Sequence, residues 1–148
     1  MSPFPRILHA SDFSPASRPA FHRALDLARA NRAVLTIVHV YSTYILVMGK
    51  GYVSGLVYDE MLAHIRTDAQ RRLGRLVAQA RKKGVRTKGL LLEGIAHEGI
   101  VRAARSTRSD LIVLGTHGRT GLGRMLLGSV AARVVTLAPC PVLTVRAT

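Results

Sequence analysis

The sequence predicts an α/β protein built on an open, five-stranded parallel sheet with helices on both faces. Five apolar runs are each too short for a typical helix, and three of them are rich in Val and Ile. Continuous apolar runs of this length suit strands that are buried on both faces of a parallel sheet. The expected strands are Arg6–Ala10, Val34–Val40, Lys88–Glu93, Leu111–Leu114 and Val142–Val145.

Helical patterns separate these runs and give the order β-α-β-α-β-α-β-α-β. Ser14 followed by Pro15 suits the start of a helix, and apolar residues recur every three or four positions in the longest segment. Such alternation implies parallel pairing through right-handed crossovers. The expected helices run from Ser14 to about Ala30, from about Asp59 to Lys83, from about Glu98 to Ser106, and from near Gly128 to before Pro139.

The length of 148 residues fits one domain, and we expect residues 1–148 to form it. Neither a linker nor an internal repeat interrupts the sequence. The segment Tyr41–Tyr58 is the least predictable part, because three glycines are scattered among its apolar residues. It is interpreted as a long connection with a loose helical turn, or alternatively as a flap over a ligand or a partner surface.

The charge balance is unusual, with 22 Lys and Arg against 8 Asp and Glu, a formal net charge of +14. Such a balance favours anionic partners. Cys140 is the only cysteine, so no internal disulfide is expected, which agrees with a cytoplasmic location. The N-terminus does not have the pattern of a signal peptide, and no apolar run approaches the roughly 20 residues of a transmembrane helix.

A glycine-framed loop follows the fourth strand and predicts a phosphate site. Gly115 and Gly118 are expected to allow positive φ and close backbone approach to a ligand. Nine residues later, Gly128 and Ser129 open the last helix, where free N–H groups and the helix dipole attract phosphate. Arg119 in this loop adds positive charge, as does Arg124. The alternative is a loop that only turns a tight corner.

Other residues at the expected carboxyl edge of the sheet add to this site. Asp12 ends the first strand, where its carboxylate can accept bonds from ribose hydroxyls or reach a magnesium ion, or alternatively cap the first helix. The backbone of Val40 can meet an adenine edge at the end of the second strand. Neither a P-loop nor the dinucleotide fingerprint Gly-x-Gly-x-x-Gly occurs.

The motif Gly-x-x-Gly, nine residues, Gly-Ser resembles the ATP-binding signature of the universal stress protein family. The resemblance extends over the whole chain, from Asp12 and the pair His39–Val40 to the segments Ser109–Val113 and Pro139–Leu143. It implies an open, Rossmann-like α/β fold of the adenine nucleotide alpha hydrolase type. It also implies a homodimer that pairs the last strand, Val142 to Arg146, across a two-fold axis.

By this resemblance the ligand is ATP, with Mg²⁺ possible through Asp12, and the protein is a stress-response regulator with at most slow hydrolysis. Its protein partner is not indicated. Ala10 departs from the proline or valine that ATP-binding members often carry there. The implied nucleotide-binding residues are Ala10, Asp12, Val40, Leu114, Gly115, His117, Gly118, Gly128, Ser129 and Val130.

Two other functions stay open as alternatives. The first is a true ATPase or nucleotidyl-transfer enzyme that uses His117 and Asp12. The second is a basic nucleic-acid-binding protein, which is less favoured because the aromatic residues are scattered and form no stacking platform. The spacing of the six histidines suits no zinc site, and a Ser129–His117–Asp12 triad would lack the Gly-x-Ser-x-Gly elbow.

Overall fold

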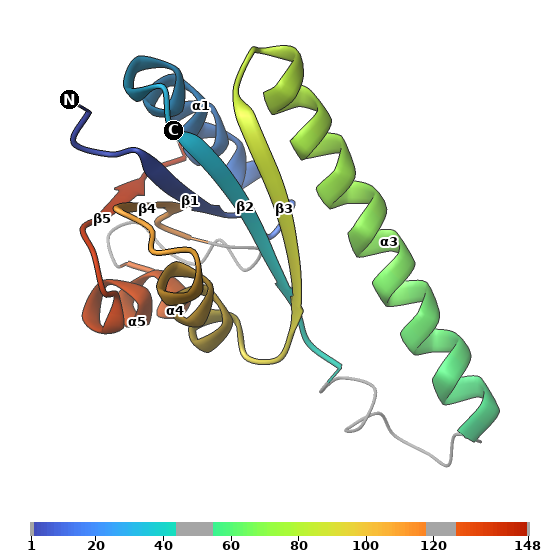
Figure 1. The fold of residues 1–148 in the computed structure, drawn as a ribbon. Helices are drawn as coiled ribbons and strands as arrows, with labels where there is room; N and C mark the ends of the chain where they lie inside the picture. Colours follow the sequence, from blue (N-terminus) through green and yellow to red (C-terminus); the bar gives the residue numbers. More distant parts are fainter. Residues whose placement is uncertain (1, 44–54, 118–126, 148) are drawn as a thin grey trace.

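The computed structural model describes residues 2–43, 55–117 and 127–147. Within them, five parallel strands form one sheet in the order β3-β2-β1-β4-β5 (Figure 1). This confirms the predicted fold class. The strands are β1 (Arg6–Ala10), β2 (Val34–Tyr41), β3 (Arg86–Glu93), β4 (Leu111–Gly115) and β5 (Val142–Val145).

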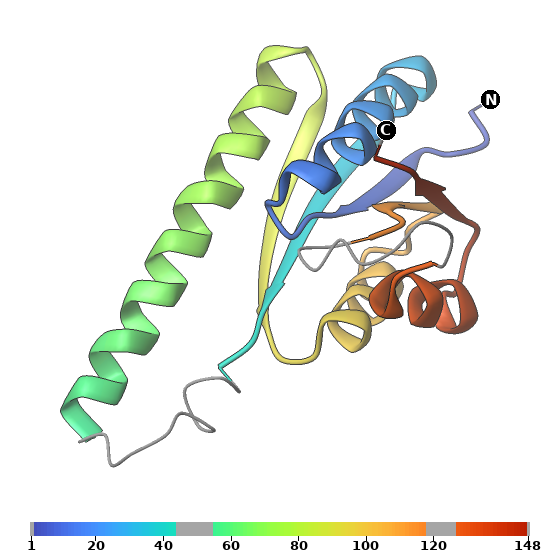
Figure 2. The same cartoon turned by 180° about the vertical axis from the view of Figure 1, so that it is seen from behind.

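Helices cover both faces of the sheet. Helices α1 and α3 lie on one face and α4 and α5 on the other (Figures 1 and 2). Side chains alternate along β1, so Ile7 packs in the cluster beneath α1 and α3 while Leu8 packs in the cluster beneath α4 and α5. The helices are α1 (Arg18–Asn31), α3 (Gly55–Lys82), α4 (Ala96–Ser106) and α5 (Ser129–Leu137).

Several predicted boundaries were wrong. Helix α3 begins at Gly55, so the last residues of the segment 41–58 are helical, and Tyr41 belongs to β2. Residues 44–54 of that segment lie outside the described residues. Strand β3 starts at Arg86, two residues earlier than expected, because it pairs with β2 over eight positions. None of the helices in the described ranges is apolar over enough of its length to cross a membrane.

The chain enters its first helix differently from the prediction. Residues Pro15–Ser17 form a single 3₁₀ turn, and α1 starts only at Arg18. Ser14 precedes that turn, yet its side chain does not cap it. The Ser14 hydroxyl instead donates a hydrogen bond to Asp12 Oδ1 at 2.5 Å. The polar contacts of this turn therefore fix the segment that follows β1 at the carboxyl edge of the sheet.

Candidate functional site

A cavity of about 580 Å³ opens at the carboxyl edge of the sheet, between the ends of β1, β2 and β4 and the start of α5. Its volume is typical of small-molecule sites. We call it the carboxyl-edge cavity. Gly118 lies outside the described residues. The other predicted nucleotide-binding residues all line it: Ala10, Asp12, Val40, Leu114, Gly115, His117, Gly128, Ser129 and Val130.

The first turn of α5 borders this cavity. Gly128 is the N-cap residue, and no side chain of the described residues caps the helix. The Gly128 N–H itself donates to the carbonyl of Thr116 at 2.7 Å, which ties the helix start to the end of β4. The amide hydrogens of the first helical turn have no acceptor within a helix, and the helix dipole places partial positive charge there. This part of the cavity is suited to an anionic group.

Close packing explains the glycines at this corner. A Cβ atom on Gly128 would lie 2.8 Å from the Thr116 carbonyl oxygen, and one on Gly115 would lie 3.3 Å from the carbonyl oxygen of His117. The expected positive φ at Gly115 was wrong, because the described glycines with positive φ are Gly84 and Gly94. Gly115 and Gly128 are therefore required for backbone proximity and not for a left-handed conformation.

Asp12 is the single charged side chain among the described residues that line the carboxyl-edge cavity. Its Oδ1 accepts hydrogen bonds from the backbone N–H of Ser14 at 2.9 Å and from the Ser14 hydroxyl. These contacts fix the orientation of the carboxylate. Asp12 thus stabilises the turn after β1 and also lines the cavity. The alternative interpretation, a cap for the first helix, was wrong, because α1 starts only at Arg18 and no side chain caps it or the 3₁₀ turn before it.

Two histidines in this region carry a buried nitrogen with no hydrogen-bond partner in the described structure. The Nδ1 of His117 is hydrogen-bonded to the Thr116 hydroxyl at 3.1 Å, with the donor set by the tautomer of the ring, and its Nε2 is unpartnered. His9 is fully buried, with Nδ1 3.0 Å from the carbonyl oxygen of Val113 and Nε2 unpartnered. His117 lines the cavity whereas His9 lies in the core beneath α1, so only His117 is placed to meet a ligand.

Some lining residues were missed by the sequence analysis. Thr116, Ala96 and Ile100 also line the cavity. Ala96 and Ile100 are four positions apart at the start of α4, directly after β3. Their spacing and their position after a strand were visible signals, since loops at the carboxyl ends of parallel strands form ligand sites. They make the α4 side of the cavity apolar.

Neither a metal centre nor a reactive thiol is found in the described ranges. No group of three or more His, Cys, Asp or Glu side chains is arranged there to hold a metal ion. Burial raises the pKa of the half-buried Cys140 thiol, and the negative charge of Asp110 raises it further. A raised pKa disfavours the reactive thiolate.

The fold and the cavity define a doubly wound α/β protein with a ligand-sized site over a helix N-terminus at the carboxyl edge of its sheet. Residues 3–146 match the model of the Universal stress protein family, and the chain belongs to this family. The resemblance inferred from the motif is thereby confirmed.

Similar proteins span nearly the whole chain. A universal stress protein of Thermus aquaticus is 36% identical over 143 residues, which cover 97% of this chain and 99% of that protein. The universal stress protein MJ0531 of Methanocaldococcus jannaschii is 34% identical over 145 residues, which cover 97% of this chain and 82% of that protein. The match therefore extends beyond the glycine motif to the whole fold.

Solved structures of similar proteins share the architecture. That of MJ0577 from the same archaeon has a TM-score of 0.85 at 25% identity, with 97% of this chain and 96% of that chain covered. A universal stress protein in complex with cAMP has a TM-score of 0.70 at 23% identity and 98% coverage of both chains. The Archaeoglobus fulgidus protein in complex with dAMP has a TM-score of 0.65 at 22% identity, covering 96% and 97%.

Proposed function

We propose that this protein binds an adenine nucleotide, with ATP as its ligand, in the carboxyl-edge cavity and acts as a nucleotide-dependent regulator. The observation that carries the proposal is the N-terminus of α5, which has no side-chain cap and borders a ligand-sized cavity. His117 also lines this cavity and adds a polar side chain to it. Two proteins of the same fold were solved with cAMP and with dAMP, which supports an adenine nucleotide.

The chemistry of the cavity suggests how the nucleotide is oriented. Its apolar side, with Val40 and Ile100, suits the adenine ring, and the backbone of Val40 can bond an adenine edge. The phosphates would lie on the amide groups of Ser129 and Val130. Asp12 also lines the cavity, where its carboxylate can accept bonds from ribose hydroxyls or hold the Mg²⁺ that accompanies ATP.

Slow hydrolysis at most is proposed. Fast phosphoryl transfer uses metal-binding carboxylates and a group that positions the nucleophile. Within the described part of the cavity the only carboxylate is Asp12, and Ser14 already bonds its Oδ1. We therefore favour a regulatory module over an ATPase or nucleotidyl-transfer enzyme.

Assembly and location belong to the same proposal. Strand β5 lies at the edge of the sheet and its residues are half-buried, so the segment Val142–Arg146 can pair with a second copy. We propose such a homodimer in the cytoplasm, in keeping with a chain that has one cysteine. Nucleotide binding would change the surface that this dimer offers to a protein partner.

Calorimetry on nucleotide-free protein tests the proposed function. ATP, AMP and cAMP are titrated separately at physiological magnesium, and mass spectrometry identifies any nucleotide that co-purifies. We expect saturable heat with a dissociation constant in the micromolar range, about −8 kcal/mol, and no steady turnover of ATP. Folded protein that gives no heat with any of the three would refute the proposal. Steady turnover that is abolished by His117→Ala would instead establish the enzyme.

Replacing Asp12 by asparagine is expected to weaken nucleotide binding about tenfold, because bonds to charged groups contribute about 1.5–3 kcal/mol. The amide oxygen of Asn can still accept the Ser14 N–H, so the turn should persist. Equal losses for AMP and for ATP would indicate the ribose contact, and a loss confined to ATP with magnesium would indicate the metal. The matched control is Asp26→Asn on the exposed side of α1, which should bind normally. Unchanged or tighter binding by Asp12→Asn would contradict the role of this carboxylate.

A further inference from the structure

The edge of the sheet opposite the carboxyl-edge cavity differs from it in chemistry. At this edge the strands begin and the preceding helices end. Hydrogen bonds hold these turns side by side: Val34 N–H donates to the Pro5 carbonyl at 2.9 Å, and Asp110 N–H donates to the Arg6 carbonyl at 2.8 Å. The Arg86 guanidinium donates to the Arg32 carbonyl at 3.0 Å. We call this surface the amino edge.

Exposed cationic side chains from three separate turns gather at the amino edge. They lie at the ends of α1, α3 and α4, and in the turns that lead into β2, β3 and β4. None of them makes an ion pair in the described structure. The group comprises Arg29, Arg32, Arg81, Lys82, Lys83, Arg86, Arg105 and Arg108.

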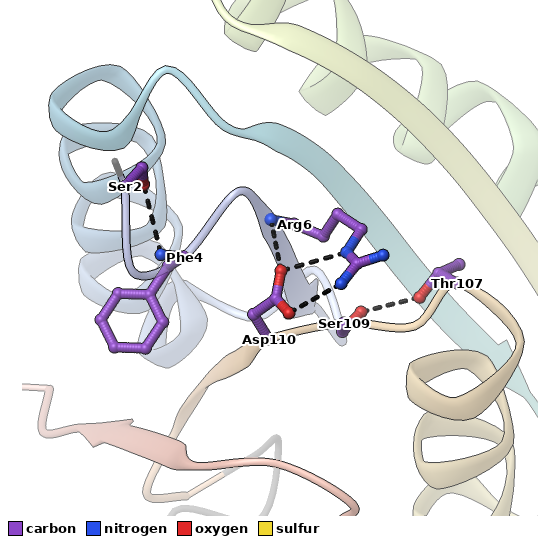
Figure 3. Close-up of polar contacts among 6 residues, drawn as sticks. All are labelled: Ser2, Phe4, Arg6, Thr107, Ser109 and Asp110. Atoms are coloured by element: carbon purple, nitrogen blue, oxygen red, sulfur yellow. Dashed lines mark hydrogen bonds and ion pairs between the residues drawn. The ribbon is translucent and has the colours of Figure 1, made fainter.

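The acidic residue at this edge, Asp110, is already paired with an arginine. Asp110 accepts the Arg6 backbone N–H at 2.9 Å and the guanidinium Nε and Nη2 at 3.1 and 2.9 Å (Figure 3). Hydrogen bonds from Arg6 hold the pKa of Asp110 below its ordinary value. The carboxylate therefore stays charged and bound to Arg6. The chain's other acidic residues follow β1, end β3 or lie on α1, α3 and the first turn of α4, so the positive charge of the edge is not compensated locally.

Stabilisation of helix ends does not account for all of these cations. A basic residue in the last turn of a helix interacts favourably with the dipole, which explains Arg29 and Arg105. Arg32 and Arg108 lie beyond those helices with φ of 49° and 51°, a conformation in which glycine or asparagine is preferred. Arginine at both positions has a backbone cost and no ion pair among the described residues to offset it.

Two arginines are also held in place before any partner binds. Arg81 donates through Nε and Nη2 to the Thr87 carbonyl at 3.2 and 2.9 Å, and Arg86 is bonded to Arg32 as described. A guanidinium carries five N–H donors, so each keeps donors for a phosphate oxygen. Side chains that are already ordered lose less entropy on binding.

We propose that the amino edge binds the sugar–phosphate backbone of double-stranded nucleic acid without sequence preference. The row follows the strand order β3-β2-β1-β4, about 14 Å at the usual strand spacing, along which a duplex presents about eight phosphates. Within the described ranges, the turns that carry this row hold no large exposed apolar side chain, since such side chains lie on α3, on α5 and beside the cavity. A membrane surface would require such side chains for insertion, and a single strand would require exposed aromatic rings.

Fluorescence anisotropy with a 20-base-pair duplex tests this proposal. The edge variant carries Arg32→Gly, Lys83→Ala and Arg108→Gly. Glycine is used at positions 32 and 108 because the backbone there is left-handed. The matched control carries Arg66→Ala, Arg71→Ala and Arg75→Ala on the exposed side of α3, so it loses the same net charge. We expect the edge variant to bind at least about tenfold more weakly, with a salt slope reduced by about 2–3, and the control to change less than about threefold.

Other readouts separate this proposal from its competitors. Gly128→Ala, which alters the carboxyl-edge cavity, should bind the duplex as the wild type does, so the proposal is independent of the nucleotide site. Equal losses in the edge variant and its control would mean that net charge alone drives binding, and would overturn the proposal. Tighter binding of the wild type to phosphatidylserine vesicles than to duplex, at equal phosphate, would also overturn it and indicate a membrane surface.

Discussion

Replacing Gly128 by alanine is expected to reduce nucleotide affinity by about 100-fold, a loss of about 2.7 kcal/mol. The new Cβ would lie 2.8 Å from the backbone oxygen of Thr116, and a backbone atom cannot rotate away as a side chain can. The end of β4 and the start of α5 must therefore separate. That movement withdraws the amide groups of the first helical turn from the position that we assign to the phosphates. Calorimetry with ATP measures the effect.

The control for this prediction is a second glycine. Gly74 lies on the exposed face of α3, and a Cβ there would meet no atom within 4 Å. Gly74→Ala should bind ATP normally and should stabilise the protein by about 0.5–1 kcal/mol, because alanine is the better helix former. If Gly128→Ala binds ATP as tightly as Gly74→Ala, the phosphates do not lie on the α5 N-terminus.

Acidification is expected to destabilise the protein by roughly 3 kcal/mol between pH 7 and pH 4 through one buried histidine. Burial lowers the pKa of His9 from its ordinary 6.5 to about 4, while the bond to Val113 and the charge of Asp12 act in the opposite direction. In the unfolded chain His9 therefore binds a proton near pH 6.5, whereas in the folded chain it binds one only near pH 4. The His9 contribution is complete above pH 6.5, is lost progressively below it, and stops changing below about pH 4.

Urea unfolding at several pH values between 7 and 4 measures this dependence. His9→Gln removes the titrating ring, so its free energy of unfolding should fall much less over the same range, whatever its value at pH 7. His22→Gln provides the matched control, since His22 is exposed on α1 and its replacement should leave the wild-type slope in place. Parallel pH profiles for the wild type and His9→Gln would show that His9 does not cause the loss.

Much of the fold was predictable because buried parallel strands must be apolar on both faces. Each of the five runs became a strand, and boundary errors arose where polar residues take part in pairing. Arg86 begins β3 although its side chain is exposed, because its backbone pairs with Val34. Apolar content alone could not signal this, since ladder pairing depends on the neighbouring strand.

The candidate site was predictable for a related reason. Asp12, Val40 and Gly115 come at the ends of three strands, and parallel strands direct those ends to one edge. The role of the glycines was not predictable, because the approach of Gly128 to Thr116 depends on how α5 returns to the sheet. The unpartnered nitrogen of His117 likewise exists only in the packed structure.

By itself, the sequence determined the order of strands and helices and pointed to the start of the last helix as a candidate anion site, since apolar periodicity and glycine spacing are local properties. The tertiary structure alone decided which cations share a surface. Arg32 and Arg108 are far apart in the chain, yet the strands that they precede, β2 and β4, lie on either side of β1 in one sheet. The physical reason is the strand order β3-β2-β1-β4-β5, which depends on long-range pairing and which no local pattern encodes.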